Sequence, residues 1–462
     1  MKLIVNEYNA LGIPIMLILN LFWANNLNKF VNVEPGSGVN EMLNGSIFIF
    51  HSNMNVVTRL VIFALQNIFI SLLPYYDMKA VVLGGAGVMG SNVVKYLSKS
   101  NVFSEIIIGD INEEMGKKIK EENEKVDFKK VDVNNKEQIS HTLRDADVVV
   151  NCVGPFYRFA PNILKASIEQ NVEYVDICDD YDITKFLIEE FNEKALNEDI
   201  TCIIGLGASP GLTNVIASYA SKQLTRVKEI KIYVTRGIKE EAGGAIPYHM
   251  LHCWLGEVPV YKNGEYIKAR GLIDGEEFVN FPEPFGQTAV YYFGHPETVT
   301  LPLYIEGIEN VCCKGSFFPK EFRDILLQLQ SLGLVSNDRV KVGRNEITPL
   351  DFLASYVGTL VKKMSESKHE IPSGGAVMVE VSGEKNGETK IYRFAGISTM
   401  REGTTAPPAL GAEMIVKGEI KSPGVKAPEA CVPPKKFMNE LLKKGIFGDT
   451  WITTTEKIKE LP

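Results

Sequence analysis

The feature that most constrains the fold is a glycine pattern close to residue 85. It reads Gly85-Ala86-Gly87-Val88-Met89-Gly90. A short β-rich run, Lys79–Leu83, precedes it, and helical periodicity follows from Val88 to Lys99. The first glycine permits a tight turn, the second lets the backbone approach a ligand, and the third permits close helix–strand packing. Because the free N–H groups that open a helix attract phosphate, the pattern predicts a strand–loop–helix unit that binds a phosphate-bearing ligand.

The glycine pattern begins a regular alternation of strands and helices. Further β-rich runs are Glu105–Gly109, Val126–Val131, Val148–Val153, Tyr174–Cys178 and Thr201–Leu206. The helical stretches between them are Glu113–Glu124 and residues 135–144, 161–170, 184–196 and 212–223. Strands that alternate with helices form βαβ units. We therefore expect an α/β fold with a Rossmann-type, doubly wound parallel sheet.

After about residue 225 the pattern changes to that of an α+β domain. Asn263-Gly264 and Asn386-Gly387 each lie between strand-like flanks, and Asn-Gly tolerates the positive φ angles of a type I′ hairpin turn. Helical patterns return at residues 349–363, 405–417 and 434–444. The predicted division is a Rossmann domain over 78–205, an inserted α+β domain over 206–400, and a C-terminal segment over 401–462 that packs back on the first domain.

Asp110 identifies the ligand of the glycine pattern as a dinucleotide. It lies about 20 positions further on, at the end of the second predicted strand, where a carboxylate accepts hydrogen bonds from ribose hydroxyls. A carboxylate would repel a 2′-phosphate, and neither Arg nor Lys follows it directly. NAD is therefore the favoured cofactor, and NADP is the alternative.

Two later strand ends should also contact the cofactor, because ligands bind at the carboxyl ends of such strands. Asp132 and Val133 should flank the adenine, although capping of a helix is an alternative role for Asp132. The residues expected beside the nicotinamide ribose are Cys152, Val153, Gly154 and Pro155.

Composition restricts the class of protein. The 462 residues suffice for two or three domains, and the net charge of -8 argues against a nucleic-acid partner. The seven cysteines are scattered, without zinc-site spacing. They are typical of reduced thiols in a cytoplasmic protein, and we expect no metal site.

The first 77 residues differ from the rest. Only 7 of them are charged, and two apolar runs, Leu11–Ala24 and Val56–Tyr76, stand out. The second approaches the length of a membrane span but contains Arg59. We expect an over-extended gene start, since Met78 directly precedes the first strand. A membrane anchor, which would tether the protein to a membrane, and a soluble extension are the alternatives.

Six segments together resemble the saccharopine dehydrogenase family. They are Gly84–Gly90, Val150–Phe156, Glu173–Asp176, Gly207–Asn214, Gly403–Pro407 and Gly424–Glu429. The resemblance covers about residues 78–446. It implies a Rossmann domain completed by C-terminal helices, an inserted substrate domain and a homodimer.

The same resemblance implies oxidation or formation of a C–N bond with NAD(P), through an imine. It suggests lysine or saccharopine as the small-molecule substrate. A polyamine-type carboxyamine is one alternative, and a dinucleotide-binding redox sensor without turnover is another.

Five side chains are candidates for substrate chemistry. Asp176 ends a predicted strand at the cleft and could bind an ammonium group or act as a base, with loop capping as the alternative. His295 and Glu297 lie in a predicted loop, where His could move protons near neutral pH. Arg158 and Arg236 could clamp a carboxylate, unless they are solvated surface charges. Packing rather than ligand binding is expected of His249, His252 and Trp254.

Overall fold

The computed structural model describes residues 77–239, 244–367, 371–445 and 450–456. Backbone contacts divide the chain into Met1–Tyr75 and Tyr76–Pro462, and all described residues belong to the second unit. The predicted anchor or extension before Met78 thus lies outside the described residues, apart from Asp77. Among the described residues, no helix is both long and apolar enough to cross a membrane.

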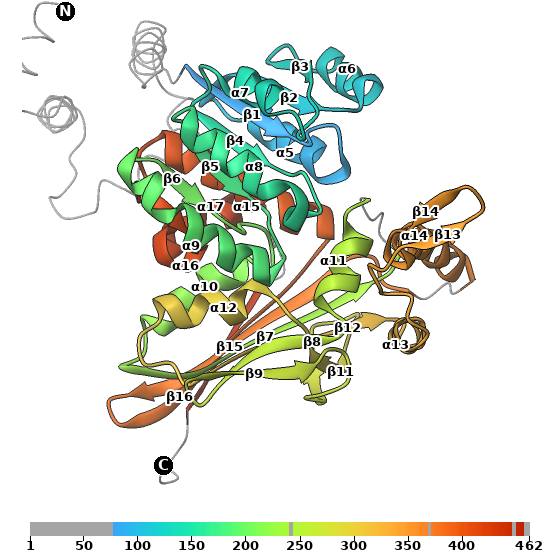
Figure 1. Ribbon diagram of the computed structural model, residues 1–462. Coiled ribbons are helices and arrows are strands. Elements are labelled where there is room, and N and C mark those ends of the chain that lie inside the picture. Colours follow the sequence, from blue (N-terminus) through green and yellow to red (C-terminus); the bar gives the residue numbers. More distant parts are fainter. Residues whose placement is uncertain (1–76, 240–243, 368–370, 446–449, 457–462) are drawn as a thin grey trace, which may run out of the picture. The chain divides into compact units, whose positions relative to one another are not determined.

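The first part of the described chain forms a parallel sheet of seven strands, in the order β17-β6-β5-β4-β1-β2-β3 (Figure 1). The strands are β1 Met78–Leu83, β2 Phe103–Asp110, β3 Val126–Lys130, β4 Val148–Asn151, β5 Glu173–Asp176, β6 Thr201–Ile203 and β17 Gly424–Lys426. Strands β1 to β6 have the order of a Rossmann fold. The predicted fold class is therefore confirmed.

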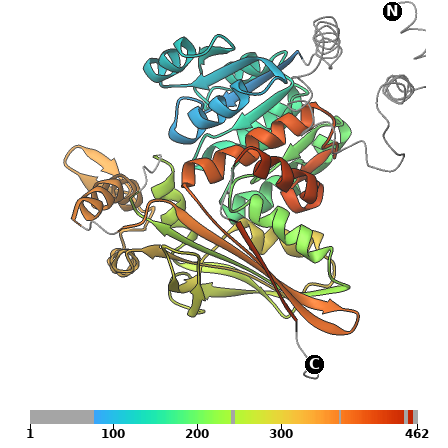
Figure 2. The same ribbon diagram turned by 180° about the vertical axis from the view of Figure 1, so that it is seen from behind.

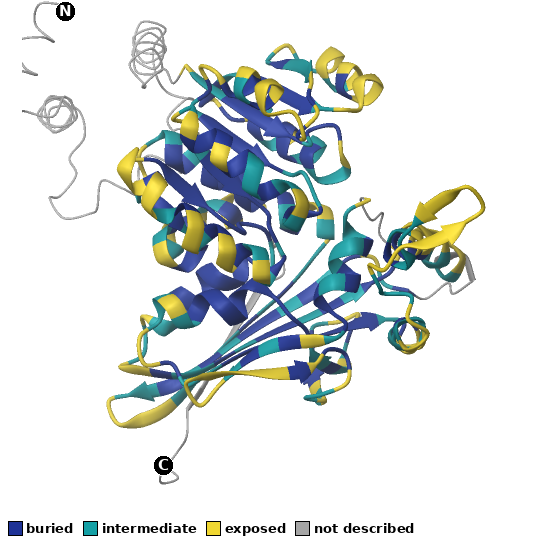
Figure 3. Ribbon diagram, viewed as in Figure 1, coloured by how far each residue is buried: buried dark blue, intermediate teal, exposed yellow. Residues whose placement is uncertain are grey.

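Helices cover both faces of this sheet, which explains why its central strands β1 and β4 are mainly apolar. They are α5 Val88–Ser98, α6 Glu113–Glu121, α7 Lys136–Leu143, α8 Phe156–Glu169 and α9 Tyr181–Asn197. Successive residues of β1 pack into different cores, since Val82 belongs to the cluster under α5 and Val81 to the cluster under α7, α8 and α9. Figure 3 shows the buried strands between partly exposed helices.

The C-terminal segment returns to the first sheet, as predicted. Its helices are α15 Met400–Val416, α16 Pro428–Cys431 and α17 Pro434–Lys443. Helix α15 packs on α5, β4 and β5, and Figure 2 shows it beside the blue α5. Strand β17 extends the parallel sheet beyond β6, a pairing that the sequence pattern did not indicate.

A second, mixed sheet of nine strands follows, with the path β10-β11-β12-β7-β15-β16-β18 and with β8 paired to β12 and β9. Its strands are β7 Arg226–Gly237, β8 Glu257–Lys262, β9 Glu265–Arg270, β10 Glu277–Asn280, β11 Gln287–Tyr292, β12 Asn310–Phe318, β15 Gly375–Lys385, β16 Glu388–Ser398 and β18 Thr450–Glu456. A separate hairpin joins β13 Val340–Val342 and β14 Asn345–Ile347. Both predicted hairpins are confirmed, because Asn263 and Asn386 have a φ of 53° in the turns β8–β9 and β15–β16.

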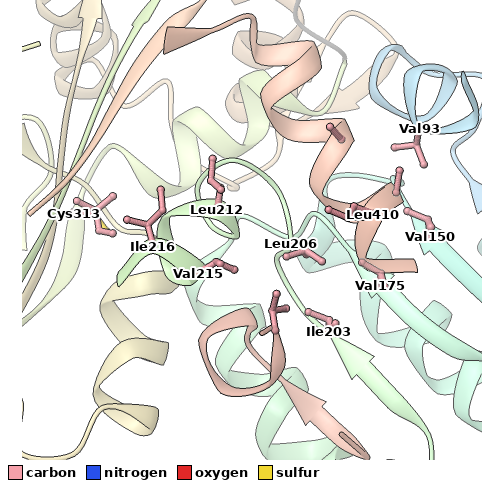
Figure 4. Packing of buried hydrophobic residues seen from close by; sticks show 14 of the residues in the cluster. Val93, Val150, Val175, Ile203, Leu206, Leu212, Val215, Ile216, Cys313 and Leu410 are labelled. Carbon is pink, nitrogen blue, oxygen red and sulfur yellow. The ribbon is translucent and has the colours of Figure 1, made fainter. Parts of the chain in front are cut away.

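One continuous core joins the two sheets. The helices of this part are α10 Leu212–Ser221, α11 Ile246–Cys253, α12 Pro296–Tyr304, α13 Glu321–Ser331 and α14 Pro349–Ser367. Figure 4 follows the core from Val175 and Ile203 of the parallel sheet, through Val215 and Ile216 of α10, to Cys313 of β12. These side chains are buried in a single cluster, so the two sheets share one core.

Candidate functional site

A cavity of about 610 Å³ lies at the carboxyl ends of the parallel strands. The loops after β1, β2, β3, β4 and β5 line one side, and β7, β15 and α11 contribute to the other. Ligands of doubly wound sheets bind at this edge. We call the part near Gly87 and Asp110 the cofactor end, and the part near His249 and His295 the substrate end.

The glycine loop at the cofactor end has the shape that a dinucleotide requires. A Cβ atom on Gly90 would lie 2.1 Å from the carbonyl oxygen of Gly84, so α5 approaches the loop as closely as a glycine allows. Gly87 lines the cavity and precedes α5 without a side-chain cap. The first N–H groups of a helix lack partners within that helix and attract a pyrophosphate. The residues present therefore fit the phosphates of a dinucleotide.

Asp110 stabilises this loop and also lines the cavity. Its Oδ2 accepts a hydrogen bond from the backbone N–H of Ala86 at 3.0 Å, and its Oδ1 accepts one from the N–H of Asn112 at 2.9 Å. Each carboxylate oxygen retains a lone pair for a ribose hydroxyl. The described residues that line the cofactor end include neither Lys nor Arg.

Most of the predicted cofactor residues line the cavity. They are Gly87, Val88, Met89, Gly90, Asp110, Asp132, Val133, Cys152, Val153, Gly154 and Pro155. Gly85 and Ala86 do not, because both residues are buried. Gly85 faces the first strand, and a Cβ atom on it would lie 2.9 Å from the Val82 carbonyl oxygen. Asp132 does not cap α7, whose first turn is capped by Asn135.

Asp176, a predicted catalytic residue, does not line the cavity. It is fully buried, and its carboxylate accepts hydrogen bonds from the N–H groups of Cys178 and Gly205 and from the Tyr174 hydroxyl, at 2.6–3.0 Å. Burial raises the pKa of this carboxyl to about 6. These contacts support the alternative role, in which Asp176 holds the loops after β5 and β6.

His295 and Glu297 lie at the start of a helix rather than in the predicted loop. Helix α12 begins at Pro296, and Glu297 occupies its first turn. Proline suits the first position of a helix because its missing N–H is not needed there, and an acidic residue in the first turn complements the helix dipole. This local preference explains why the segment is helical.

The two side chains form a buried pair at the wall of the substrate end. Glu297 Oε2 lies 2.5 Å from His295 Nδ1, while Glu297 Oε1 accepts hydrogen bonds from the hydroxyls of Ser209 and Thr213, each at 2.6 Å. Burial alone would raise the pKa of Glu297, but His295 and the two hydroxyls outweigh this effect and lower it. An ionised carboxylate only accepts, so Nδ1 of His295 carries the hydrogen and Nε2 is left for a cavity ligand.

A second pair at this end was not anticipated from the sequence. His249 of α11 lines the cavity, and its Nδ1 lies 3.0 Å from Asp180 Oδ1 and 3.3 Å from Asp179 Oδ1. His249 therefore does more than pack on its helix, since its side chain also faces the cavity. A usable signal was present, because Asp179 and Asp180 follow β5 at the carboxyl edge of the sheet, just as Asp132 follows β3.

The two predicted substrate arginines lie in different places. Arg236 of β7 lines the cavity, close enough to His249 to oppose protonation of that imidazole. Arg158 of α8 lies outside the cavity lining, with its Nη2 at 3.3 Å from Asp351 Oδ1 and its guanidinium over the Tyr248 ring. Arg158 therefore links α8 to α11 and α14, and of these two arginines Arg236 is the one that lines the cavity.

Two clusters combine side chains of metal-binding types. Donor atoms lie within 4.8 Å of one another in the sets Asp180, His249, Cys253 and His295, Glu297, Cys313. Burial raises the pKa of both cysteines well above the ordinary value, which favours the thiol over the thiolate that binds metals. The absence of a metal cofactor stays a prediction.

Sequence comparisons match both halves of the described chain. Residues 80–203 match the saccharopine dehydrogenase NADP binding domain, and residues 207–446 match the saccharopine dehydrogenase C-terminal domain. The chain is 21% identical over 336 residues to a carboxyaminopropylagmatine dehydrogenase of Synechocystis sp., covering 67% of this chain and 82% of that protein. A saccharopine dehydrogenase-like oxidoreductase of Mus musculus is 28% identical over 72 residues, which cover 16% of this chain and 17% of the relative.

The fold is shared with a solved structure. The apo form of saccharopine dehydrogenase (L-Glu forming) from Saccharomyces cerevisiae matches with a TM-score of 0.60 and 15% identity, over 83% of this chain and all of that one. The family match over residues 80–203, rather than this likeness of fold, identifies the domain of the first sheet as one that binds a nicotinamide dinucleotide. With both domain types matched in order along the sequence, the chain belongs to the saccharopine dehydrogenase family.

Proposed function

We propose that this protein is an NAD(P)-dependent amino-acid dehydrogenase that oxidises a C–N bond of lysine, saccharopine or a related amine through an imine, which water then hydrolyses. Members of the family are oxidoreductases acting on CH–NH donors. The observation that carries the proposal is the buried His295–Glu297 pair, on the wall of a cavity whose other end fits a dinucleotide.

The cofactor end provides for binding and orientation. When bound, the dinucleotide accepts a hydride from the carbon that bears the nitrogen. The first N–H groups of α5 would hold the pyrophosphate, and Asp110 would accept hydrogen bonds from the ribose. The carboxylate, with neither Lys nor Arg among the described lining residues nearby, favours NAD. NADP is the alternative, supported by the description of the matched domain.

The charges of the substrate end suit an amino acid. Asp179 and Asp180 would attract an ammonium group, while Arg236 would attract a carboxylate. A lysine-like or saccharopine-like molecule carries both groups. Its carbon–nitrogen bond could then lie between these residues and the cofactor end.

His295 is proposed to move the protons. The amine must lose a proton before the hydride leaves, and water must lose protons during hydrolysis of the imine. Nε2 of a neutral imidazole can accept these protons, while ionised Glu297 stabilises the imidazolium that forms. Ser209 and Thr213 hold Glu297 in place through the other carboxylate oxygen.

A carboxyamine of the polyamine type is a second candidate substrate. The relative from Synechocystis sp. is a carboxyaminopropylagmatine dehydrogenase, and the match spans 82% of it. A distal cationic group would meet the same carboxylates, Asp179 and Asp180.

A substrate panel tests the proposal. Lysine, saccharopine, carboxyamines and simple amines are each offered with NAD and with NADP, and the absorbance of the reduced cofactor is followed. We expect reduction with one class of amine that carries a carboxylate, faster with NAD than with NADP. Dinucleotide binding without reduction by any amine would instead favour a sensor that does not turn over.

A further inference from the structure

His249 occupies a position that the mechanism above does not use. It lies on α11, opposite the loops of the parallel sheet, and lines the substrate end. Its ring centroid is 5.7 Å from that of His295, with the two planes at 75°. Two imidazoles, each bound through Nδ1 to a carboxylate, thus face one small space. In both, Nε2 is the ring nitrogen without a carboxylate partner among the residues that the structure describes.

The groups around His249 favour its protonated form. Burial alone would lower its pKa, but Asp179 and Asp180 outweigh this effect and the pKa is raised, even though Arg236 opposes them. Hydrogen bonding to His249 likewise lowers the pKa of Asp180 against the effect of burial. The other titratable neighbours are His252 and Cys253 on the same helix and His295 across the cavity. His249 therefore keeps a proton to higher pH than an isolated imidazole.

Hydrolysis of an imine has a need that this arrangement meets. The reaction turns C=N and water into C=O and an amine, so a C–O bond forms, the C–N bond breaks, and both protons of water end on nitrogen. No electrons are gained or lost in this step. One group must take protons from oxygen while another delivers protons to nitrogen. Two titratable groups held in different electrostatic surroundings can divide these tasks.

We propose that His249 is a second catalytic residue, the acid that protonates the departing nitrogen, while His295 accepts the protons of water. This assignment rests on the proposed function and adds the identity of the acid. Asp180 and Asp179 are its positioning residues, with the role that Glu297 has for His295. After each turnover, His249 regains its proton from His295 or from solvent.

A purely structural role is the competing explanation, because His249 also ties α11 to the loop before α9. His252 provides the matched control. It lies one helical turn further along α11, and its Nε2 is 3.1 Å from Asp182 Oδ2, but it does not line the cavity. Loss of either histidine removes contacts between α11 and the first domain, whereas of the two only His249 lines the cavity.

The test compares the full chain with its variants His249→Gln, His252→Gln and Asp180→Asn, using an amine that the wild type oxidises. We expect His249→Gln to lower the steady-state rate about 100-fold. A fast burst of one reduced cofactor per chain should remain, because hydride transfer precedes the blocked step. His252→Gln should stay close to the wild type.

The pH profiles give a readout that a structural role would not change. An acid loses its proton as the pH rises, so wild-type activity should fall on the alkaline side as His249 deprotonates. In Asp180→Asn this fall should begin at lower pH, because the raised pKa depends on the carboxylate, while the acidic limb stays in place. Dinucleotide affinity and thermal unfolding, measured for each variant, show that it is folded.

Equal losses in His249→Gln and His252→Gln, no burst, or an unmoved alkaline limb in Asp180→Asn would overturn the assignment alone. Failure of the wild type to reduce the cofactor with any amine would overturn the proposed function, and the assignment with it.

Discussion

The two ends of the cavity are built in different ways. The cofactor end consists of loops after consecutive strands, between residues 84 and 155, and much of what it offers is main chain. The substrate end combines the side chains of Asp180, His249 and His295, which come from three separate segments. A short sequence pattern can specify backbone geometry, whereas a side-chain network exists only after the tertiary fold has formed. Local changes should therefore affect the two ends in separable ways.

The largest effect is expected from Glu297→Gln at the substrate end. Glutamine keeps the shape but offers one acceptor oxygen, where Glu297 accepts from His295 and from two hydroxyls. At least one donor is then left facing the amide NH2, and the imidazolium loses its counter-charge. We expect kcat to fall about 1000-fold with unchanged dinucleotide affinity, measured by steady-state kinetics and calorimetric titration.

Glu429→Gln is the matched control for this prediction. Glu429 is also buried, its Oε2 accepts from Asn214 at 2.9 Å, and it does not line the cavity. Burial raises its pKa to about 7, so glutamine resembles the protonated form. We expect nearly wild-type kcat. An equal loss of kcat in both variants would mean that either buried carboxylate is needed for a correctly formed site. It would contradict a specific role of the His295–Glu297 pair in proton transfer.

The same contrast explains how much the sequence could predict. The glycine pattern, Asp110 and the alternation of strands and helices all depend on neighbours close in sequence, and the Rossmann sheet and the cavity lining near Gly87 follow from them. Asp176 and Asp180 show the limit. Asp176 ends β5 and Asp180 follows four residues later, yet only Asp180 lines the cavity. The backbone N–H groups that occupy Asp176 include one from Gly205, beyond the next helix.

The sequence indicates His295 and Glu297 as candidates, but it does not indicate which residues hold them in place. The proton-transfer capacity of histidine gave the first signal. The hydroxyls that fix Glu297 come from Ser209 and Thr213, more than 80 positions earlier in the chain. No local pattern reveals such a contact, because α10 and α12 meet only when the two sheets share their core.

A second prediction concerns the backbone of the glycine loop at the cofactor end. In Gly90→Ala the new Cβ would lie 2.1 Å from the Gly84 carbonyl oxygen, so the loop must move away from α5. We expect dinucleotide affinity to fall on the order of 100-fold, equivalent to about 2.7 kcal/mol, by calorimetric titration. Gly358→Ala is the control, since nothing lies within 4 Å of its Cβ position in α14. Undiminished affinity in Gly90→Ala would show that close packing of this loop is not needed for binding.

The smallest effect is expected from a change of cofactor preference, Asp110→Ser combined with Ile111→Arg. The change removes the carboxylate that opposes a 2′-phosphate and adds a guanidinium at an exposed lining position, where Ile111 is 67% exposed. Serine retains an acceptor for the Ala86 N–H, so the loop should keep its shape. We expect the ratio of kcat/KM for NADP over NAD to rise about tenfold, because one charge-assisted contact contributes about 1.5–3 kcal/mol and part of it is lost to solvent.

The single variants separate the two contributions to that change. Ile111→Arg alone should gain little, because Asp110 would pair with the new guanidinium. Asp110→Ser alone should weaken binding of NAD without creating a site for the 2′-phosphate. A ratio that stays constant in the double variant would place the ribose contact elsewhere. The cofactor end would then bind the dinucleotide through the glycine loop alone. No side chain there would distinguish NAD from NADP, and the contrast with the substrate end would lie in backbone geometry only.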